Sequence, residues 1–275
     1  MDTSDKKMEN LKELTTAVCE IARSAGAFLA EERKRFRREA VVEKHAHDYV
    51  SYVDKESERR IVAALQALLP QAGFITEEGL GTYQDEPYCW VVDPLDGTTN
   101  FIHDNTPYCV SIALRSRDEL LLGVVYEPAR DECFYGWLGG GAYLNGEPMH
   151  VSAVQQPEQA FVVAELPYNA DRYAATAVHL IQSLYGKVAG IRMNGSAALA
   201  LCYVAAGRFD AWVEAFIGKW DYSAAALLIQ EAGGCVTDFE GHAHYLEGHH
   251  IVATNGPLHP WLLQLVREVP PRLDE

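Results

Sequence analysis

The chain has 275 residues, 48% of them apolar, and 39 Asp and Glu against 23 Lys and Arg give it a formal net charge of −16. This share of apolar side chains fills a sizeable core, which excludes a disordered or fibrous chain and leaves one large domain or two joined halves. The negative charge repels nucleic acid phosphates and anionic membranes, so we do not expect nucleic acid as a partner. Residues 1–14 lack the apolar centre of a secretory signal and no run reaches 18 apolar residues, which predicts a cytoplasmic protein without a membrane span.

The cysteines and histidines show no spacing typical of zinc. The six cysteines lie far apart in apolar runs without a C-x-x-C pair, which favours buried free thiols. They are Cys19, Cys89, Cys109, Cys133, Cys202 and Cys235. Four histidines crowd the segment from Gly241 to His250, but their spacing fits no helical ligand pair, so we expect a polar loop between strands.

The chain opens with two expected helices. Apolar residues recur with helical spacing from Leu11 to Leu29, and the charged run from Glu31 to Glu39 ends this first helix. The five basic residues of that run are Arg33, Lys34, Arg35, Arg37 and Arg38. A solvated helix end is the simplest interpretation, and a patch for RNA or a protein partner is the alternative. Ser51 and Asp54 have the spacing of a capping box, which places Asp54 in the first turn of a second helix that Pro70 and Gly73 close.

Short β-prone runs follow at residues 74–76, 88–92, 109–114, 121–126 and 133–137, with Asn145-Gly146 as a hairpin signal. They predict a largely antiparallel sheet backed by the two helices. The glycine-rich stretch from Gly136 to Gly141 leads into that hairpin signal rather than into a helix, so we interpret it as a hairpin and not as a dinucleotide site.

After residue 150 the pattern changes to alternating strands and helices. We expect strands near 161–164 and 211–216, with one more between them, and helices near 172–184, 196–206 and 221–232. This half reads as a smaller, mixed α/β unit. We therefore divide the chain into residues 1–150 and 151–275, two halves that share a cleft.

The most informative segment is WVVDPLDGTTNF, residues 90–101. Asp93 and Asp96 lie three positions apart at the end of an expected strand, and with the carbonyl of Leu95 they offer hard oxygen ligands to one point. Gly97, Thr98 and Thr99 then offer backbone N–H groups, which are suited to a phosphate if a helix begins there. An ordinary Asx turn that caps a helix is the alternative.

Two further carboxylates follow element ends: Glu77 after the strand at 74–76, and Asp221 at the start of a helix. If all four acids converge, each pair at about 4 Å repels by roughly 4 kcal/mol at an effective dielectric of 20. Such a cluster needs cations. A set of oxygen ligands without His or Cys favours magnesium or manganese over zinc.

Four segments of the chain resemble the inositol monophosphatase family of magnesium-dependent phosphomonoesterases: the EE of FITEEG, DPLDGTTNF, GSAALALCYVAAGRFDAWVE and WDYSAAALLIQEAGG. The similarity runs from about Leu11 to Leu265. It implies an α+β or α/β fold built as a layered αβαβα sandwich, a homodimer, two or three Mg²⁺ per site with Mn²⁺ as an alternative, and sensitivity to lithium.

The resemblance also implies the role of each site residue. The metal ligands are Glu77, Asp93, Asp96, Asp221 and the carbonyl of Leu95. Asp54 and Thr98 activate the attacking water, with Glu77 counted among the catalytic residues, and the N–H groups of Gly97 and Thr98 hold the phosphate. Asp96 and Asp221 also face the substrate, whose alcohol side meets Gly195, Ser196, Ala197 and Glu214.

These residues predict direct, in-line hydrolysis of a small polyol phosphate, with myo-inositol 1-phosphate as the leading substrate and no covalent phosphoenzyme. Thr99-Asn100-Phe101 favours this over a 3′-phosphoadenosine 5′-phosphate phosphatase, in which a Lys commonly follows DGT. Histidinol phosphate, fructose 1,6-bisphosphate and a lipid head group stay open as substrates. Glu165-Leu166-Pro167-Tyr168 departs from the turn of many relatives, so Tyr168 is expected to narrow or reshape the pocket. A regulatory protein that retains the fold is the alternative outside enzymes.

Overall fold

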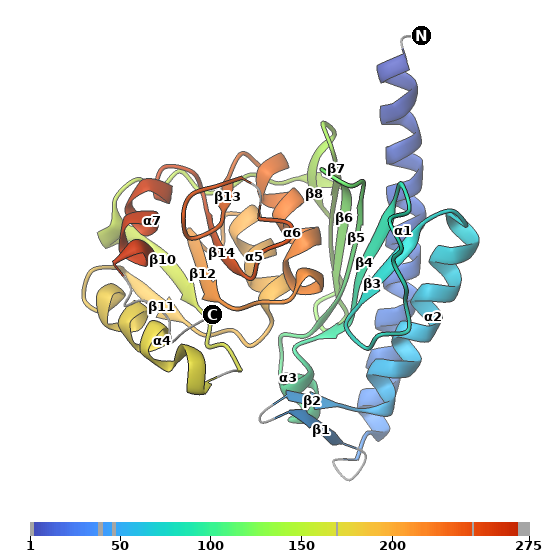
Figure 1. The fold of residues 1–275 in the computed structure, drawn as a ribbon, viewed down its shortest axis with the longest axis horizontal. Coiled ribbons are helices and arrows are strands. Elements are labelled where there is room, and N and C mark those ends of the chain that lie inside the picture. Colours follow the sequence, from blue (N-terminus) through green and yellow to red (C-terminus); the bar gives the residue numbers. More distant parts are fainter. Residues whose placement is uncertain (1–2, 38–40, 46–47, 169, 244, 269–275) are drawn as a thin grey trace.

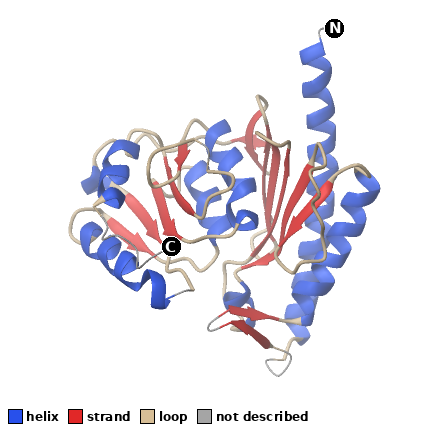
Figure 2. Ribbon diagram, in the orientation of Figure 1, coloured by secondary structure: helices blue, strands red, loops and turns tan. Residues whose placement is uncertain are grey.

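The computed structural model describes residues 3–37, 41–45, 48–168, 170–243 and 245–268. Two sheets stand side by side with helices on both outer faces and between them (Figures 1 and 2). In the described part of the chain the layers follow the order helix, sheet, helix, sheet, helix. The αβαβα sandwich expected from the sequence is thereby confirmed.

The larger sheet has seven strands in chain order, and only the first pair is parallel. Its strands are β3 (Gly73–Thr76), β4 (Cys89–Asp96), β5 (Cys109–Arg115), β6 (Leu120–Glu127), β7 (Glu132–Trp137), β8 (Gly141–Leu144) and β9 (Glu147–Pro148). The long helix α1 (Thr3–Arg35) packs on β5, β6 and β7, while α2 (Tyr52–Leu68) packs on β4. The expected antiparallel sheet and its two helices are present, and the 136–141 stretch forms the β7–β8 hairpin.

The smaller sheet has five strands, in the order β11, β10, β12, β14, β13. They are β11 (Gly190–Arg192), β10 (Phe161–Ala164), β12 (Ala211–Ala215), β14 (His250–Thr254) and β13 (Cys235–Thr237). Helices α5 (Ala197–Ala205) and α6 (Lys219–Glu231) fill the layer between the sheets, and α4 (Ala170–Leu184) and α7 (His259–Arg267) cover the outer face. Both central helices are buried almost all round, as a helix between two sheets must be.

One apolar cluster joins the two sheets through the central helices. It includes Val91 and Val125 of the large sheet, Leu201 and Leu228 of the central helices, and Trp212 of the small sheet. The chain crosses from one sheet to the other between β9 and β10, through a short 3₁₀ turn at Pro157–Gln159. Both halves of the chain contribute to this core, and the division into residues 1–150 and 151–275 stays a prediction.

Several elements go beyond the sequence-based expectations. Short strands β1 (Val42–His45) and β2 (Asp48–Val50) form a small separate sheet near the five-residue helix α3 (Thr98–Ile102). Strands β13 and β14 flank the polar loop that we expected between strands, but their bounds were not predicted, and helix α7 was not predicted at all. The described histidines of the 241–250 segment lie in the loop before β14, except His250, which begins that strand.

Three smaller expectations have mixed outcomes. All six cysteines are free, and five are buried, but Cys235 is half-buried. Helix α1 ends at Arg35, within the charged run, and Arg38 and Glu39 lie outside the described residues. Among the helices that the structure describes, none combines the length and apolar character needed to cross a membrane.

Candidate metal centre and active site

Three aspartates from two layers meet at one point. Carboxylate oxygens of Asp93, Asp96 and Asp221 all lie within 4.8 Å of one another. Asp93 and Asp96 are buried, and Asp93 shares a hydrogen bond with Glu77. Burial, followed by the charges of Glu77, Asp96 and Asp221, raises the pKa of Asp93 well above its ordinary value. The four acids that sequence reasoning selected therefore form one cluster of strongly repelling groups.

The end of β4 delivers the first two aspartates. The strand pairs regularly with β5 up to Asp93, and its register then shifts before Asp96, across Pro94. Gly97 follows with φ +88°, and a Cβ there would lie 2.8 Å from the Pro107 carbonyl oxygen. Only glycine fits this reversal. The chain then begins α3 at Thr98, as the motif suggests.

Asp221 is positioned by the start of α6. Its Oδ2 accepts a hydrogen bond from the Gly218 N–H at 2.9 Å, which fixes the carboxylate in the first turn of the helix. The Ser111 hydroxyl on β5 donates to the Trp220 carbonyl at 3.0 Å. Because Ser111 lies opposite Asp93 in the sheet, the same pair of strands holds the aspartates from both layers in register.

Asp54 and Thr98 also meet. The expected capping box is present, because Asp54 Oδ2 accepts bonds from the Ser51 N–H at 2.8 Å and the Ser51 hydroxyl at 2.7 Å. The single hydroxyl proton of Thr98 has two acceptors within reach, Asp54 Oδ1 and the Leu95 carbonyl, both 3.0 Å from Oγ1. Burial raises the pKa of Asp54 despite these bonds. A fully buried carboxylate thus holds the threonine hydroxyl beside the cluster.

Sequence reasoning missed Glu58, which organises the loop that carries Glu77. Glu58 is fully buried on α2, and its two oxygens accept bonds from Thr76 Oγ1 at 2.9 Å and from the N–H groups of Glu78 and Leu80, each at 2.8 Å. The preceding residue on the helix, Ser57, donates its hydroxyl to the Pro94 carbonyl at 3.1 Å. The available signal was the spacing of Asp54, Ser57 and Glu58 on one helix face.

Groups at the start of α5 donate hydrogen bonds to Asp96 from the other side of the cluster. Ser196 Oγ donates to Asp96 Oδ2 at 2.5 Å, and the N–H groups of Ala198 and Ala197 reach its two oxygens at 2.9 and 3.3 Å. Thus Ser196 and Ala197, expected on the alcohol side, contact a candidate metal ligand. Glu214, at the end of β12, is only 8% exposed. Burial and the charges of Glu165, Asp221 and Asp96 raise the pKa of Glu214 well above its ordinary value, which excludes a merely solvated surface charge.

The basic run at the end of α1 is largely paired within the protein. Arg33 bonds to the Phe101 carbonyl at 2.7 Å and to Asp104 at 3.0 Å. Lys34 and Arg35 pair with acids three residues earlier on the same helix. The described part of this run therefore stabilises the helix end and its contact with α3.

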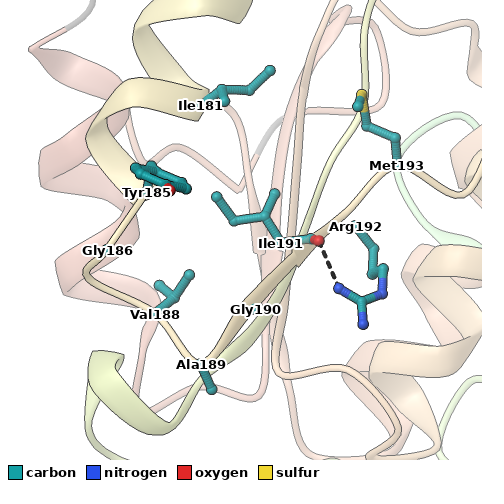
Figure 3. Close-up of a pocket in the computed structure, with 9 residues that line it drawn as sticks. All are labelled: Ile181, Tyr185, Gly186, Val188, Ala189, Gly190, Ile191, Arg192 and Met193. Carbon is teal, nitrogen blue, oxygen red and sulfur yellow. Dashed lines mark hydrogen bonds between the residues drawn. The ribbon is translucent and has the colours of Figure 1, made fainter.

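A separate apolar hollow lies between the end of α4 and β11, the edge strand of the small sheet (Figure 3). Ile181 of the helix and Tyr185 just after its end lie beside Val188 and Ile191 there, and Arg192 donates to the Ile191 carbonyl. None of its lining residues belongs to the acidic cluster. The hollow is therefore distinct from the candidate metal centre.

The cluster fits a hard divalent cation. Its described donors are carboxylate oxygens, and such a set matches magnesium or manganese. The raised pKa of Asp93 also indicates a requirement for a cation, because these neighbouring carboxylates ionise together only when positive charge balances them.

The layered fold and its carboxylate centre define an α/β protein built around a candidate metal site. A model of the inositol monophosphatase family matches residues 10–270. The chain therefore belongs to the inositol monophosphatase family, which confirms the resemblance seen in its motifs.

Individual relatives match over almost the whole chain. Nus factor SuhB of Pseudomonas aeruginosa is 43% identical over 262 residues, which cover 92% of this chain and 95% of the relative. Inositol-1-monophosphatase of Mesorhizobium japonicum is 36% identical over 256 residues, covering 93% and 96%. The solved structure of inositol monophosphatase from Anabaena superposes with a TM-score of 0.85 at 33% identity, covering 95% of this chain and 98% of that one.

Proposed function

We propose that this protein is a magnesium-dependent phosphatase of small polyol phosphate monoesters, with myo-inositol 1-phosphate as the leading substrate. The observation that carries the proposal is the hydrogen bond from Thr98 to the buried Asp54, beside the cluster of Asp93, Asp96 and Asp221. Membership of the family and the inositol-1-monophosphatase relative support it.

In this proposal Glu77, Asp93, Asp96, Asp221 and the Leu95 carbonyl hold the cations. Bound Mg²⁺ would supply positive charge that stabilises the phosphoryl oxygens and makes water more acidic. Thr98 donates its hydroxyl proton toward Asp54, so its oxygen is free to accept a hydrogen bond from the attacking water. The raised pKa of Asp54 makes this carboxylate a better base than an exposed one.

The other residues bind the substrate. The N–H groups of Gly97 and Thr98 hold phosphoryl oxygens at the start of α3. Gly195 and the buried Glu214 lie on the alcohol side, where the Glu214 carboxylate accepts hydrogen bonds from ring hydroxyls. Partial desolvation, followed by the charges of Asp96, Asp221 and Glu214, raises the pKa of the Tyr168 hydroxyl, although 58% of this residue is exposed. This supports a position of Tyr168 at the open edge of the acidic site.

A turnover assay tests the proposal. Purified protein is incubated with Mg²⁺ and a panel of inositol 1-phosphate, histidinol phosphate, fructose 1,6-bisphosphate, 3′-phosphoadenosine 5′-phosphate and a lipid head group that carries a phosphate monoester on its inositol ring. We expect inositol 1-phosphate to give the highest kcat/KM, and we expect chelator to abolish and lithium to reduce the rate. Full activity in excess chelator would contradict the metal assignment, and preference for another ester would replace the substrate.

The relatives named Nus factor favour a second, regulatory function as another candidate. They do not support our expectation that nucleic acid is excluded as a partner. Fluorescence anisotropy with labelled single-stranded RNA at 50 and 200 mM salt tests this candidate, because contacts to phosphates weaken steeply with salt. Absence of binding at both salt concentrations would exclude direct RNA recognition by the chain alone. We also propose that the protein forms a homodimer and is located in the cytoplasm. Light scattering measures the oligomeric state.

A further inference from the structure

A second buried carboxylate lies beside Glu214. Glu165 directly follows β10, and its N–H donates to the Val213 carbonyl at 3.2 Å, so it neighbours the residue before Glu214 on the parallel strand β12. Glu165 is 9% exposed, and burial raises its pKa to about 6. The roles that the family resemblance implies leave this residue without a function.

The Glu165 carboxylate holds a turn rather than a cation. Its Oε1 accepts hydrogen bonds from the N–H of Asn194 at 2.7 Å and the N–H of Gly195 at 3.2 Å. These two residues connect β11 to α5, and Gly195 has φ +70°, a conformation that favours glycine. An ionised acceptor makes such bonds about twice as strong as neutral ones.

The same turn is held from the opposite side by Asn100 of α3. The Asn100 amide donates to the carbonyls of Asn194 at 3.1 Å and Gly195 at 3.3 Å, and to the Pro107 carbonyl at 2.8 Å. The turn therefore lies between a residue of the small-sheet half and a residue next to the DGT motif. With its N–H groups and its carbonyls both bonded, it has little freedom to shift.

The residues just after the turn contact Asp96. Ser196 follows Gly195 directly and donates to Asp96 Oδ2 at 2.5 Å, and the Ala198 N–H donates to the same oxygen at 2.9 Å. Any movement of the Asn194–Gly195 turn displaces these donors. The orientation of the Asp96 carboxylate thus depends on the anchor that Glu165 provides.

We propose that Glu165 is a positioning residue of the active site: it anchors the Asn194–Gly195 turn, and the anchored turn orients Asp96 through Ser196 and Ala198. The inference rests on the proposed function for its kinetic consequences. Because Glu165 acts through Asp96, its loss lowers the turnover of every phosphate ester, whatever the leaving group. Displacement of Gly195 on the alcohol side adds a further loss only on inositol 1-phosphate.

The first test uses Glu165→Ala and Glu165→Gln. The alanine variant loses the acceptor, whereas the glutamine oxygen can still receive both N–H groups. We expect Glu165→Ala to lower kcat/KM by about tenfold to hundredfold on both inositol 1-phosphate and p-nitrophenyl phosphate, and Glu165→Gln to stay within about threefold of wild type on both. A loss confined to inositol 1-phosphate, or an equal loss in both variants, would overturn the proposal.

Hydrogen exchange gives a readout that does not need turnover. The backbone amides of residues 194–198 should exchange faster in Glu165→Ala than in wild type or Glu165→Gln, with other segments unchanged. Unchanged exchange in this peptide would overturn the proposal, and faster exchange throughout the chain would show a general structural role instead. If wild type hydrolyses no ester, the proposed function fails while this measurement still decides the role of Glu165.

Glu165→Asp keeps the test possible if the alanine variant does not fold, because its shorter carboxylate cannot reach both N–H groups. It should then show the same local exchange and the same loss on both esters, and wild-type behaviour in both readouts would contradict the anchoring role. Combining Glu165→Ala with Asn100→Ala adds a matched check. Because both residues anchor the same turn, the loss of kcat/KM in the double variant should differ from the product of the two single losses. A loss equal to that product would show that the two residues act independently and would contradict the shared anchor.

Discussion

At the scale of single residues, the site is a set of buried acids whose positions are fixed by hydrogen bonds but whose charges oppose one another. Asp93 illustrates both properties, because its Oδ1 accepts the Leu95 N–H at 2.9 Å while burial, followed by the charges of Glu77, Asp96 and Asp221, raises its pKa. A protein without function at this point would gain stability from a neutral residue there. The retained charge is therefore best explained by a bound cation.

Asp93→Asn tests this explanation. The amide oxygen still accepts the Leu95 N–H, but the charge is gone, so we expect turnover to fall to background while the melting temperature of metal-free protein holds or rises. Differential scanning fluorimetry in chelator and a phosphate-release assay with Mg²⁺ measure the two effects. Asp118→Asn, an exposed acid, is the control and should change neither. Near-wild-type turnover of Asp93→Asn would show that the metal assignment is wrong.

Glu214→Gln tests the substrate class rather than the hydrolytic residues. Glutamine keeps the shape but weakens charge-assisted hydrogen bonds, so kcat/KM on inositol 1-phosphate should fall roughly 10-fold to 150-fold. Turnover of p-nitrophenyl phosphate, which has no ring hydroxyls, should change much less. Equal losses on both esters would assign Glu214 to the metal site or the fold, and no loss on either would leave it without a role in binding.

At the scale of elements, α2 acts as the frame of the site. Three side chains of its first two turns make hydrogen bonds to the site. Asp54 accepts from Thr98, Ser57 donates to the Pro94 carbonyl, and Glu58 accepts from Thr76 and from the loop after β3. The capping box was predictable, because it depends on residues three positions apart. The role of Glu58 was not, since its partners lie 18 to 22 residues away and only the folded sheet brings them to the helix.

Glu58→Ala should therefore loosen the loop that carries Glu77. The buried Thr76 hydroxyl and two partly buried N–H groups lose their acceptor, so we expect the free energy of unfolding to fall by about 2 to 4 kcal/mol. The Mg²⁺ concentration for half-maximal activity should also rise several-fold. Urea unfolding and a Mg²⁺ titration of the rate measure these changes. Glu56→Ala, on the exposed face of the same helix, should affect neither, and an unchanged Mg²⁺ requirement in Glu58→Ala would contradict the link to Glu77.

The sequence predicted long periodic elements better than short ones. Helices α1 and α2 and strands β4 to β7 follow clear apolar patterns, and each lies where we expected it. Strand β13 has three residues, and β14 begins with the polar His250, so neither carries a period of its own. Their pairing with β12 is decided by contacts between distant segments, which no local pattern records.

At the scale of the whole molecule, the site exists only because two sheets and the helices between them meet. Asp93 and Asp96 come from the large sheet, Asp221 and Ser196 from the central helices, and Glu214 from the small sheet. The motifs were visible in the sequence, but their convergence required the family resemblance. Because so many acids lie at one point, their mutual repulsion is an electrostatic cost to the stability of the metal-free protein.

That cost predicts how the stability of metal-free protein depends on pH. The pKa of Glu165 rises from 4.5 to about 6 on folding, so the folded state binds the proton more tightly. Stability from this group is fully present below pH 4.5 and is lost as pH rises through 6, a change of about 2 kcal/mol. The raised pKa values of Asp54, Asp93, Asp96 and Glu214 act in the same direction. His259, whose pKa is lowered by burial, opposes them below pH 6.5. Five glutamates with lowered pKa values oppose them only near and below their ordinary pKa of 4.5: Glu31, Glu32, Glu56, Glu132 and Glu247.

Metal-free protein should therefore melt at a higher temperature at pH 5.5 than at pH 8, and saturating Mg²⁺ should reduce this difference because bound cations stabilise the ionised acids. Melting curves in chelator and in Mg²⁺ across pH 5.5 to 8 measure both effects. Asp93→Asn provides the matched comparison, since removal of one acid from the cluster should flatten the metal-free profile. A metal-free melting temperature that stays level or falls on acidification would show that burial and mutual repulsion do not raise the pKa values of these acids in the folded protein.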